Sequence, residues 1–298
     1  LICDAVNLPV DGSWSVFSNE CATATSGEPN GSTWGESGID NSVWFTFVAP
    51  ASGEVEVSLD TLLSLDDSQL AIYQSDDGTC TGALTEVASD DDSGFTGFGF
   101  LSVANAECLV PGETYFVQVD GYLGDAGEFG IKVTPGAGPG PATNNALCDA
   151  TVLTIGNQVS ASNFCADSDI DDPVPSCFTN DNSTWFSFQA PLSGAVVFTF
   201  NNATFDLEFA VYEATGTACP PDTLEEIVCD GTSLTNPSLG VSCLDPFRTY
   251  YIMVDGLAGA EGTFDIELFD ANPGADLGPD NACQALLAPG ITAGSSVL

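Results

Sequence analysis

The sequence predicts an all-β chain of tandem antiparallel β-sandwiches, of the jelly-roll or immunoglobulin-like kind, joined by short linkers rich in proline and glycine. The first observation is a duplication: the ten residues from Trp44 to Gly53 occur again from Trp185 to Gly194, with seven of the ten identical. The second is periodicity, because apolar residues alternate with a period of two and no segment sustains a helical period. The third is length, because 298 residues suit about two domains of roughly 150 residues each.

The elements of the first copy follow from local composition. The aromatic segment that begins at Trp44 is expected to be a buried strand, which Pro50 ends and Ser52-Gly53 turns into a partner strand. Trp44 and Phe45 should point to opposite faces of the sheet. The segment 23–40, rich in Gly, Ser, Asn and acids, is expected to be a loop. The other expected strands are 5–10, a segment that ends at Cys21, 54–59, 70–73, 98–103, and a closing hairpin of 115–121 with 127–131.

The second copy repeats these elements in the same order. Its partner strand is expected at 195–200, its next strand from Phe209 to Tyr212, and its closing hairpin at 250–256 with 262–266. The offset between the copies shrinks from 145 to 135 along the chain, and each change of length falls in an expected loop. Both copies are therefore expected to share one framework.

The domain boundaries follow from the copies and from the proline- and glycine-rich segments after them. Because Asn281-Ala282-Cys283 repeats the pattern of Asn145 to Cys148, the end of the chain is expected to begin a truncated third sandwich or to serve as a donor strand. No signal peptide precedes Leu1, so we expect a processed chain or a segment of a longer protein. The expected boundaries are 1–135 and 144–270 for the sandwiches, 136–143 and 271–279 for the linkers, and 280–298 for the third unit.

The charge of the chain is its most unusual property. It has 43 acidic residues against Lys132 and Arg248, a net charge of −41, and no histidine. Nucleic acid and anionic membrane surfaces are disfavoured as partners, because binding them needs clustered Lys and Arg. No run of about 18 apolar residues occurs, so no segment is expected to insert into a membrane. Two cations allow few ion pairs, so self-repulsion must be offset by salt screening or by bound cations.

Eleven cysteines indicate an oxidising compartment. Aligning the copies matches four cysteines of the first with four of the second, which predicts two recurring disulfides in each sandwich. Two further cysteines occur only in the second copy, and we expect them to pair with each other. The expected pairs are Cys3–Cys21, Cys80–Cys108, Cys148–Cys165, Cys219–Cys243 and Cys177–Cys229, with Cys283 left over.

Calcium is the candidate cofactor. This cation takes six to eight oxygen ligands, which Asp-rich loops can supply. No EF-hand loop occurs in the sequence, and Asp-Gly is also ordinary turn chemistry, so solvated acidic loops are the alternative. The candidate ligands are Asp66, Asp67, Asp90, Asp91, Asp92 and Asp120 in the first copy, and Asp206, Asp230 and Asp255 in the second.

Catalysis is not expected. Without histidine the chain has no Ser–His or Cys–His nucleophile system, and among 43 acids a carboxylate pair is uninformative. Sugar binding is a further hypothesis, because Trp14 and Trp34 occur only in the first copy and an exposed indole can stack on a sugar ring. Local packing is the alternative for both. The candidate glycosylation sites are Asn30, Asn182 and Asn202 for N-linked glycans, and Thr61 and Thr223 for O-linked glycans.

Three motifs occur twice in the same order: the aromatic strand before Ala-Pro and Ser-Gly, an Asp before a strand that ends in Tyr, and the closing Tyr-x-x-x-Val-Asp-Gly hairpin. Over about residues 40–134 and 181–269 they resemble the bacterial pre-peptidase C-terminal domain. The resemblance implies a jelly-roll-like sandwich on secreted and surface proteins, with no catalytic role and sometimes with calcium. Tandem copies of this kind look like the repeats of giant surface adhesins and filaments.

The hypothesis drawn from the sequence is a structural segment of a bacterial extracellular filament or surface adhesin. Its partners would be further copies of itself or adjacent repeats, with surface glycans as candidate ligands. Its function would be mechanical, because disulfide-bonded sandwiches and short linkers make a stalk. The alternative is a pair of non-catalytic accessory modules that hold a secreted hydrolase on a substrate or glycan.

Overall fold

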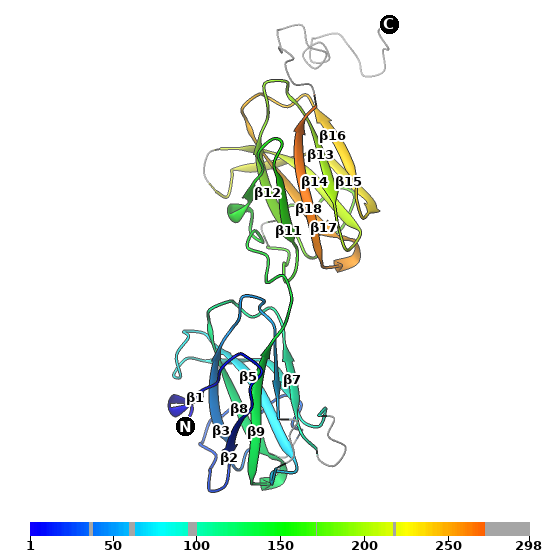
Figure 1. Cartoon of the computed structure of the whole chain (residues 1–298). Helices are drawn as coiled ribbons and strands as arrows, with labels where there is room; N and C mark the ends of the chain where they lie inside the picture. Colours follow the sequence, from blue (N-terminus) through cyan, green and yellow to red (C-terminus); the bar gives the residue numbers. More distant parts are fainter. Residues whose placement is uncertain (36–37, 60–62, 95–99, 171, 217–218, 272–298) are drawn as a thin grey trace, which may run out of the picture. The chain divides into compact units, whose positions relative to one another are not determined.

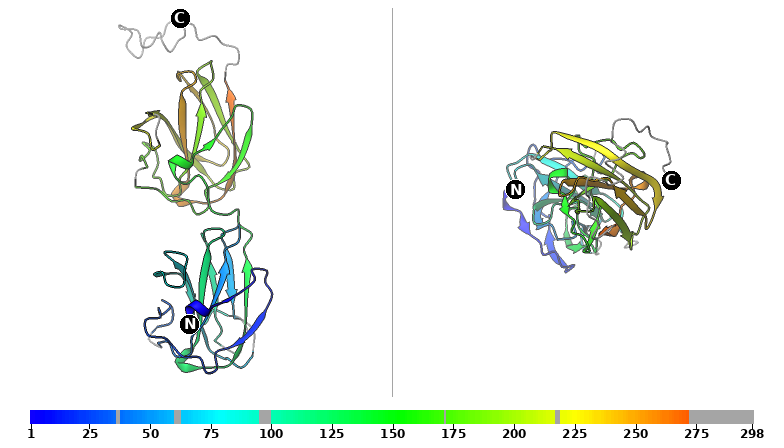
Figure 2. Two further views of the ribbon diagram at one scale, coloured as in Figure 1. Left: turned by 90° about the vertical axis from the view of Figure 1, so that its left-hand side faces the viewer. Right: turned by 90° about the horizontal axis from the view of Figure 1, so that it is seen from above.

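The computed structural model describes residues 1–298 except 36–37, 60–62, 95–99, 171, 217–218 and 272–298. The chain divides into two compact units, Leu1–Pro141 and Ala142–Leu298. Each is a two-layer β-sandwich, as the sequence predicted (Figure 1; Figure 2, left). The third unit and second linker expected at 271–298 lie, after Ala271, outside the described residues.

The first sandwich packs a five-stranded sheet, in the order β1-β3-β8-β5-β6, against a four-stranded sheet, in the order β2-β9-β4-β7. The pairs are antiparallel except that β1 runs parallel to β3, with Val6 opposite Phe45. A short 3-10 helix, η2 (Tyr122–Gly124), follows β8, and η1 (Ile2–Asp4) precedes β1. The strands are β1 (Val6–Asn7), β2 (Ser15–Ser18), β3 (Val43–Val48), β4 (Val55–Ser58), β5 (Ser68–Ser75), β6 (Leu84–Asp90), β7 (Val103–Ala106), β8 (Thr114–Gly121) and β9 (Glu128–Pro135).

The second sandwich has the same topology, with sheets β10-β12-β17-β14-β15 and β11-β18-β13-β16. Again the first strand, β10, is parallel to its neighbour β12. Its 3-10 helices are η3 (Leu147–Asp149) and η4 (Leu257–Gly259). The strands are β10 (Thr151–Val152), β11 (Gln158–Ser162), β12 (Thr184–Gln189), β13 (Ala195–Asn201), β14 (Leu207–Thr215), β15 (Thr223–Leu234), β16 (Ser238–Ser242), β17 (Thr249–Gly256) and β18 (Thr263–Asp270).

Each five-stranded sheet buries both of its faces. Phe45 and Phe47 point into the core between the sheets. Trp44 lies on the opposite face, in an outer cluster with Trp34, Tyr73 and other buried side chains, as the alternation of the strand predicts. In the second sandwich Trp185 occupies the same outer position beside Tyr212. The loops before β3 and β12 therefore cover apolar surface that would otherwise be exposed.

The disulfides correct the predicted pairing. Cys3 bonds to Cys80 and Cys148 bonds to Cys219, so each joins the segment before the first strand to the loop after β5 or β14. These bonds rule out the predicted pairs Cys3–Cys21, Cys80–Cys108, Cys148–Cys165 and Cys219–Cys243. The physical reason is topology: η1 crosses the outer face near Trp44, which brings Cys3 to Cys80 across 77 residues. The expected pair Cys177–Cys229 is confirmed.

The other cysteines also depart from expectation. Cys21 is exposed and has a free thiol. Cys108, Cys165 and Cys243 are disulfide-bonded. The bonded cysteines are typical of proteins in an oxidising compartment, as the composition indicated. Within the described residues, no helix has the length and the apolar character needed to span a bilayer.

The two ends of each sandwich are distinct. The turn end carries the turn at 50–53 or 191–194, and the helix end carries η2 or η4. In the first sandwich the chain leaves at the turn end, where Gly136 donates its N–H to the carbonyl of Glu54. Residues 136–141, assigned to a linker from sequence, belong to this unit, and Gly138 donates to the Glu54 carboxylate over 3.2 Å.

In the second sandwich the path of the chain runs from one end to the other. Ala142 donates its N–H to the carbonyl of Phe164, beside the loop that packs near η4. Ala271, after β18, donates to Ala195 at the opposite, turn end. The chain therefore joins this sandwich at its helix end and leaves at its turn end.

Candidate functional site

The candidate metal centre is an acidic cluster of Asp67, Asp91 and Asp92 in the first sandwich. Asp67 lies just before β5, and the other two lie just after β6. Because β5 and β6 are antiparallel neighbours, with Leu70 opposite Asp90, the beginning of one meets the end of the other. One carboxylate oxygen from each of the three lies within 4.8 Å of the others.

The cluster is electrostatically unfavourable without a counterion. Burial, followed by repulsion from Asp92, Asp91 and Asp125, raises the pKa of Asp67 to about 6. Burial and the neighbouring Asp92 also raise the pKa of Asp91, although a hydrogen bond from Gln69 opposes the rise. A divalent cation would be attracted by this arrangement, and three carboxylates could supply part of the six to eight oxygens that calcium takes.

Two other predicted ligands of the first sandwich, Asp90 and Asp66, take part in hydrogen bonds that stabilise the local structure. Asp90 accepts hydrogen bonds at Oδ2 from the N–H groups of Ser93 (3.0 Å) and Val103 (2.8 Å), which fixes the end of β6 beside β7. Asp66 is exposed, and its N–H donates to Asp125 Oδ2 over 3.0 Å. Neither belongs to the group of three convergent carboxylates.

Asp120 and Asp255, also predicted as ligands, are buried framework residues in equivalent positions. Each carboxylate accepts three main-chain hydrogen bonds and thereby holds the loop before β3 or β12. Burial raises the pKa of both groups, while these hydrogen bonds lower it. The donors are Asp40 (2.8 Å), Asn41 (2.7 Å) and Gly121 (2.9 Å) for Asp120, and Asp181 (2.7 Å), Asn182 (3.1 Å) and Gly256 (2.6 Å) for Asp255.

The second sandwich has no comparable acidic cluster among its described residues. The strand registers place Asp206 where the first sandwich has Asp67, but Gly231 and Thr232 stand in place of Asp91 and Asp92. The remaining candidate, Asp230, accepts hydrogen bonds at Oδ1 from the hydroxyl (2.6 Å) and N–H (3.0 Å) of Thr232. Among the described residues, the candidate calcium site is therefore found in the first sandwich and not in the second.

Sequence reasoning missed Asp125. Its Oδ2 accepts the N–H groups of Asp66 and Asp67, each over 3.0 Å, and its charge contributes to the raised pKa of Asp67. The signal was available: Ala260 stands at the matching position of the second copy, so this acid, like Asp91, occurs only in the first.

The two tryptophans predicted to contact glycans differ. Trp34 is 1% exposed in the outer cluster, and its Nε1 donates to the carbonyl of Leu70 over 3.2 Å. It cannot stack on a sugar, so the packing alternative holds. Trp14 is 44% exposed, and Lys132 Nζ lies 5.1 Å from its ring centroid. The registers of β2 and β11 place Gln158 of the second sandwich at the position of Trp14.

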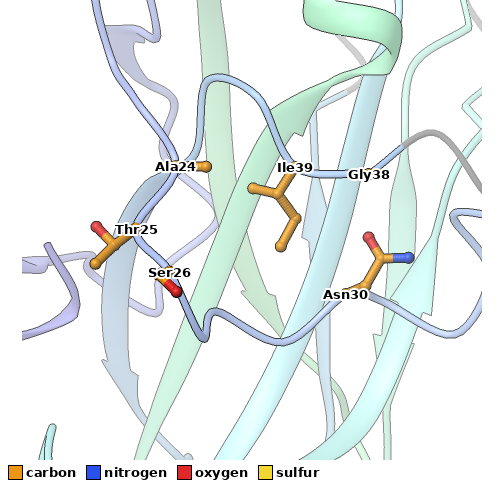
Figure 3. Close-up of a pocket in the computed structure, with 6 residues that line it drawn as sticks. All are labelled: Ala24, Thr25, Ser26, Asn30, Gly38 and Ile39. Atoms are coloured by element: carbon orange, nitrogen blue, oxygen red, sulfur yellow. The ribbon is translucent and has the colours of Figure 1, made fainter.

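Two hollows lie beside the loop that precedes β3. One, of about 580 Å³, lies between the two passes of this loop (Figure 3) and is lined mainly by small and neutral side chains: Ala24, Thr25, Ser26, Asn30, Gly38 and Ile39. The other, of about 540 Å³, lies between η1, residues 25–29 and residues 82–84, beside the Cys3–Cys80 bond. Trp44 lines it, and the buried Nε1 of Trp44 has no hydrogen-bond partner among the described residues. In the second sandwich Trp185 Nε1 donates to Asp172 over 3.1 Å.

The candidate glycosylation sites have different environments. Asn30 and Thr223 are exposed. Asn202 is exposed, but its amide donates to Asp265 over 2.7 Å. Asn182 is half-buried and donates to Glu261 (2.8 Å) and to the carbonyl of Ala166, so a glycan there would disrupt packed contacts. Thr61 lies outside the described residues.

No family model and no curated protein matches the chain, so the likeness to the pre-peptidase C-terminal domain remains one of motifs. Among solved structures, the tandem CBM22 domain from Xyn10C of Paenibacillus barcinonensis is 11% identical, with 88% of this chain and 95% of that one covered and a TM-score of 0.25. The tandem CBM51 modules of the family 98 glycoside hydrolase from Streptococcus pneumoniae are 12% identical, with 90% and 96% covered and a TM-score of 0.21. Exported protein XepA of PBSX is 12% identical, with 80% and 88% covered and a TM-score of 0.22. Scores this low carry no functional argument.

Proposed function

We propose that the chain is a load-bearing segment of an extracellular bacterial filament or surface adhesin, in which the sandwiches serve as stalk units. The observation that carries this proposal is one disulfide-bonded sandwich framework built twice. In the second sandwich the chain joins at one end and leaves at the other, which suits a unit that transmits tension along its length. A chain without histidine is also poorly equipped for nucleophilic catalysis.

The disulfides would limit how far each unit extends under load. The Cys3–Cys80 bond closes a loop with a sequence separation of 77 residues. An extended chain spans about 3.4 Å per residue, so this bond withholds about 260 Å of length if the first sandwich unfolds. A unit that gives up little length on unfolding keeps the two ends of a stalk close together.

Force spectroscopy tests this role. The oxidised chain is pulled from handles at both ends, and the Cys3→Ser, Cys80→Ser double variant is compared with it. We expect the variant to lengthen by about 260 Å more when the first sandwich unfolds. Cys21→Ser, which removes no bond within the sandwich, is the matched control and should leave the extension unchanged. Equal extension of the oxidised chain and the double variant would contradict the proposed mechanical role of the bond.

We further propose that the acidic cluster of Asp67, Asp91 and Asp92 binds calcium. What supports this is the convergence of three carboxylates, within 4.8 Å, at a place where burial and mutual repulsion already disfavour their charged forms. A cation there would tie the start of β5 to the end of β6 and would offset part of the charge of the chain. Melting of the wild-type chain with and without calcium tests this, with Asp67→Asn as the variant and Asp206→Asn as the control.

A second candidate function is that of a non-catalytic module that binds glycans. It is favoured by Trp14, a residue that is 44% exposed just before β2, the edge strand of the four-stranded sheet. Binding of the full chain to immobilised bacterial and plant polysaccharides tests it, with Trp14→Ala as the variant and Trp14→Phe as the aromatic control. We expect Trp14→Ala to lose any binding and Trp14→Phe to retain most of it. Binding that is unaffected by Trp14→Ala would reject the assignment of this surface.

A further inference from the structure

Cys21 is a free, exposed thiol at the helix end of the first sandwich. It sits in a tight turn: Ala22 donates its N–H to the carbonyl of Asn19, and Asn19 exchanges hydrogen bonds with Gly127 at the start of β9. The φ of Cys21 is 63°, in the left-handed region that few side-chain-bearing residues adopt. The turn therefore holds the thiol in a fixed position at the end of the sandwich.

The second sandwich presents a cysteine from the same turn, and there it is bonded. Cys165 has a φ of 56°, Ala166 donates to Asn163, and Asn163 exchanges the same hydrogen bonds with Gly262. Cys165 is disulfide-bonded. The matched geometry of the two turns shows that this position presents its sulfur in a way that a disulfide can use.

Cys21 has no partner within reach in its own sandwich. Cys3 and Cys80 are bonded to each other. Cys108 lies at the turn end, where the next residue, Leu109, donates its N–H to the carbonyl of Gly53 over 2.9 Å. The eight residues of β8 run between the two ends, a distance of about 24 Å, whereas the Cα atoms of a disulfide lie within about 7 Å.

The turn ends carry a recurring cysteine of their own. Cys108 and Cys243 begin the pattern Cys-Leu-x-Pro in the loop beside the turn at 50–53 or 191–194, with φ values of 58° and 69°. Both are disulfide-bonded. Two sandwiches of this kind placed end to end would bring a helix-end cysteine of one next to a turn-end cysteine of the other.

We propose that Cys21 is a cross-linking site, which forms a disulfide with the Cys-Leu-x-Pro cysteine at the turn end of a sandwich of this kind other than the two described, because Cys108 and Cys243 are already bonded. The oxidant is a disulfide-carrying protein or small molecule. The Cys21 thiolate attacks a sulfur of this oxidant and releases its first thiol, and the partner thiolate then attacks the Cys21 sulfur and releases the second. In total two thiols lose two protons and two electrons, and one disulfide of the oxidant is reduced to two thiols.

The test uses native material extracted in the presence of a thiol-alkylating reagent. The protein is digested at acidic residues without reduction, and the peptide that contains Cys21 is identified by mass spectrometry. We expect this peptide to be disulfide-linked to one that contains Cys-Leu-x-Pro. Alkylated Cys21, or Cys21 linked to a small thiol or to Cys3 or Cys80, would overturn the proposal.

Variants add a second readout in cells that produce the protein. Cys21→Ser should abolish high-mass bands on non-reducing gels, and unchanged melting of the first sandwich confirms that it folds. The Cys177→Ser, Cys229→Ser control removes a bond inside a sandwich and should keep those bands. Bands that persist in Cys21→Ser would overturn the proposal. The choice of partner rests on the proposed stalk function, but the experiments distinguish the two proposals. Elongated particles in which Cys21 is alkylated would support the stalk function and reject the cross-link.

Discussion

The two sandwiches share one framework of strands. They differ in the contacts that hold the loop covering the outer face of the five-stranded sheet. The same Tyr in each closes the loop at the turn end: Tyr115 OH accepts the N–H of Val110 over 2.9 Å, and Tyr250 OH accepts that of Asp245 over 2.8 Å. The differences begin in the loop that covers the five-stranded sheet. Where Thr33 Oγ1 lies 3.0 Å from Ser89 Oγ in the first sandwich, the second has the Cys177–Cys229 disulfide.

This difference shows that one contact can be made in two chemical ways. The neighbouring contact is unchanged, since Ser32 N–H donates to Glu86 over 2.8 Å and Ser176 N–H donates to Glu226 over 2.7 Å. The covering loop is thus held at the same place in both units, by hydrogen bonds alone in one and with an added covalent bond in the other. Within the part of the chain that the structure describes, the Cys177–Cys229 disulfide and the acidic cluster thus each occur in one unit only, without a change in the shared strand order.

The largest effect is expected where the two units are most alike. Asp120→Ala and Asp255→Ala should each lower the free energy of unfolding of their own sandwich by about 4 kcal/mol, because three main-chain N–H groups, one of them buried and two part-buried, lose their acceptor. Calorimetry of the full chain measures both transitions. Glu107→Ala, at an exposed position, is the control and should change stability by less than about 0.5 kcal/mol. Unequal losses for the two Asp variants would break the idea of a common framework.

A somewhat smaller effect should follow from exchanging the two versions of the loop contact. Cys177→Ala with Cys229→Ala should destabilise the second sandwich by about 3 kcal/mol, and Thr33→Cys with Ser89→Cys should stabilise the first by a similar amount when oxidised. Denaturant unfolding with and without reductant measures both changes. If the new cysteines in the first sandwich form no disulfide, the loops before β3 and β12 do not occupy equivalent positions, contrary to the strand registers.

The smallest effect is expected at the acidic cluster. Because the pKa of Asp67 rises from an ordinary value near 4 to about 6 on folding, the folded state holds more protons between these values. Stability should therefore fall as the pH rises from about 4 to about 6, and remain lower above that range. With chelator at pH 7, Asp67→Asn should raise the melting temperature of the first sandwich by a few degrees.

With calcium at constant ionic strength, the first sandwich of the wild type should melt at a higher temperature than that of Asp67→Asn. The reason is that calcium stabilises the folded state to which it binds, and Asp67→Asn removes one of its ligands. Asp206→Asn, at the matching position of the second sandwich, is the control and should not alter the response to calcium. An equal rise in melting temperature with calcium for wild type and Asp67→Asn would leave the cluster as a solvated group of acids.

The sequence allowed the fold to be predicted because the duplication marks framework positions. Trp44 and Trp185, for example, identify the same strand twice, and alternation assigns their faces correctly. Strand β6 (Leu84–Asp90) was missed, because none of its residues is buried and the run of acids after it suggested a loop. Its register beside β5 depends on packing that no local pattern encodes.

The cysteines and acids show where sequence reasoning stops. Alignment correctly established which cysteines correspond between the copies, but it could not show that Cys3 crosses the sheet to meet Cys80. Likewise, the sequence could not separate carboxylates that accept main-chain N–H groups, such as Asp120, from those left facing one another, such as Asp91. Both distinctions depend on contacts between residues distant in the chain.

The positions of the two basic residues affect how readily proteases can cleave the chain. Trypsin-like proteases cleave after Lys or Arg, so the chain offers them only Lys132 and Arg248. Lys132 lies within β9, between β2 and β4, and pairs with Glu56, whereas Arg248 binds Glu213, Asp245 and the carbonyl of Ala214. Because Lys132 lies inside the sheet, a protease must wait for that strand to open, so cleavage after Lys132 should report on unfolding of the first sandwich. Scarcity of positive charge thus makes the folded chain a poor substrate for a widespread class of enzymes.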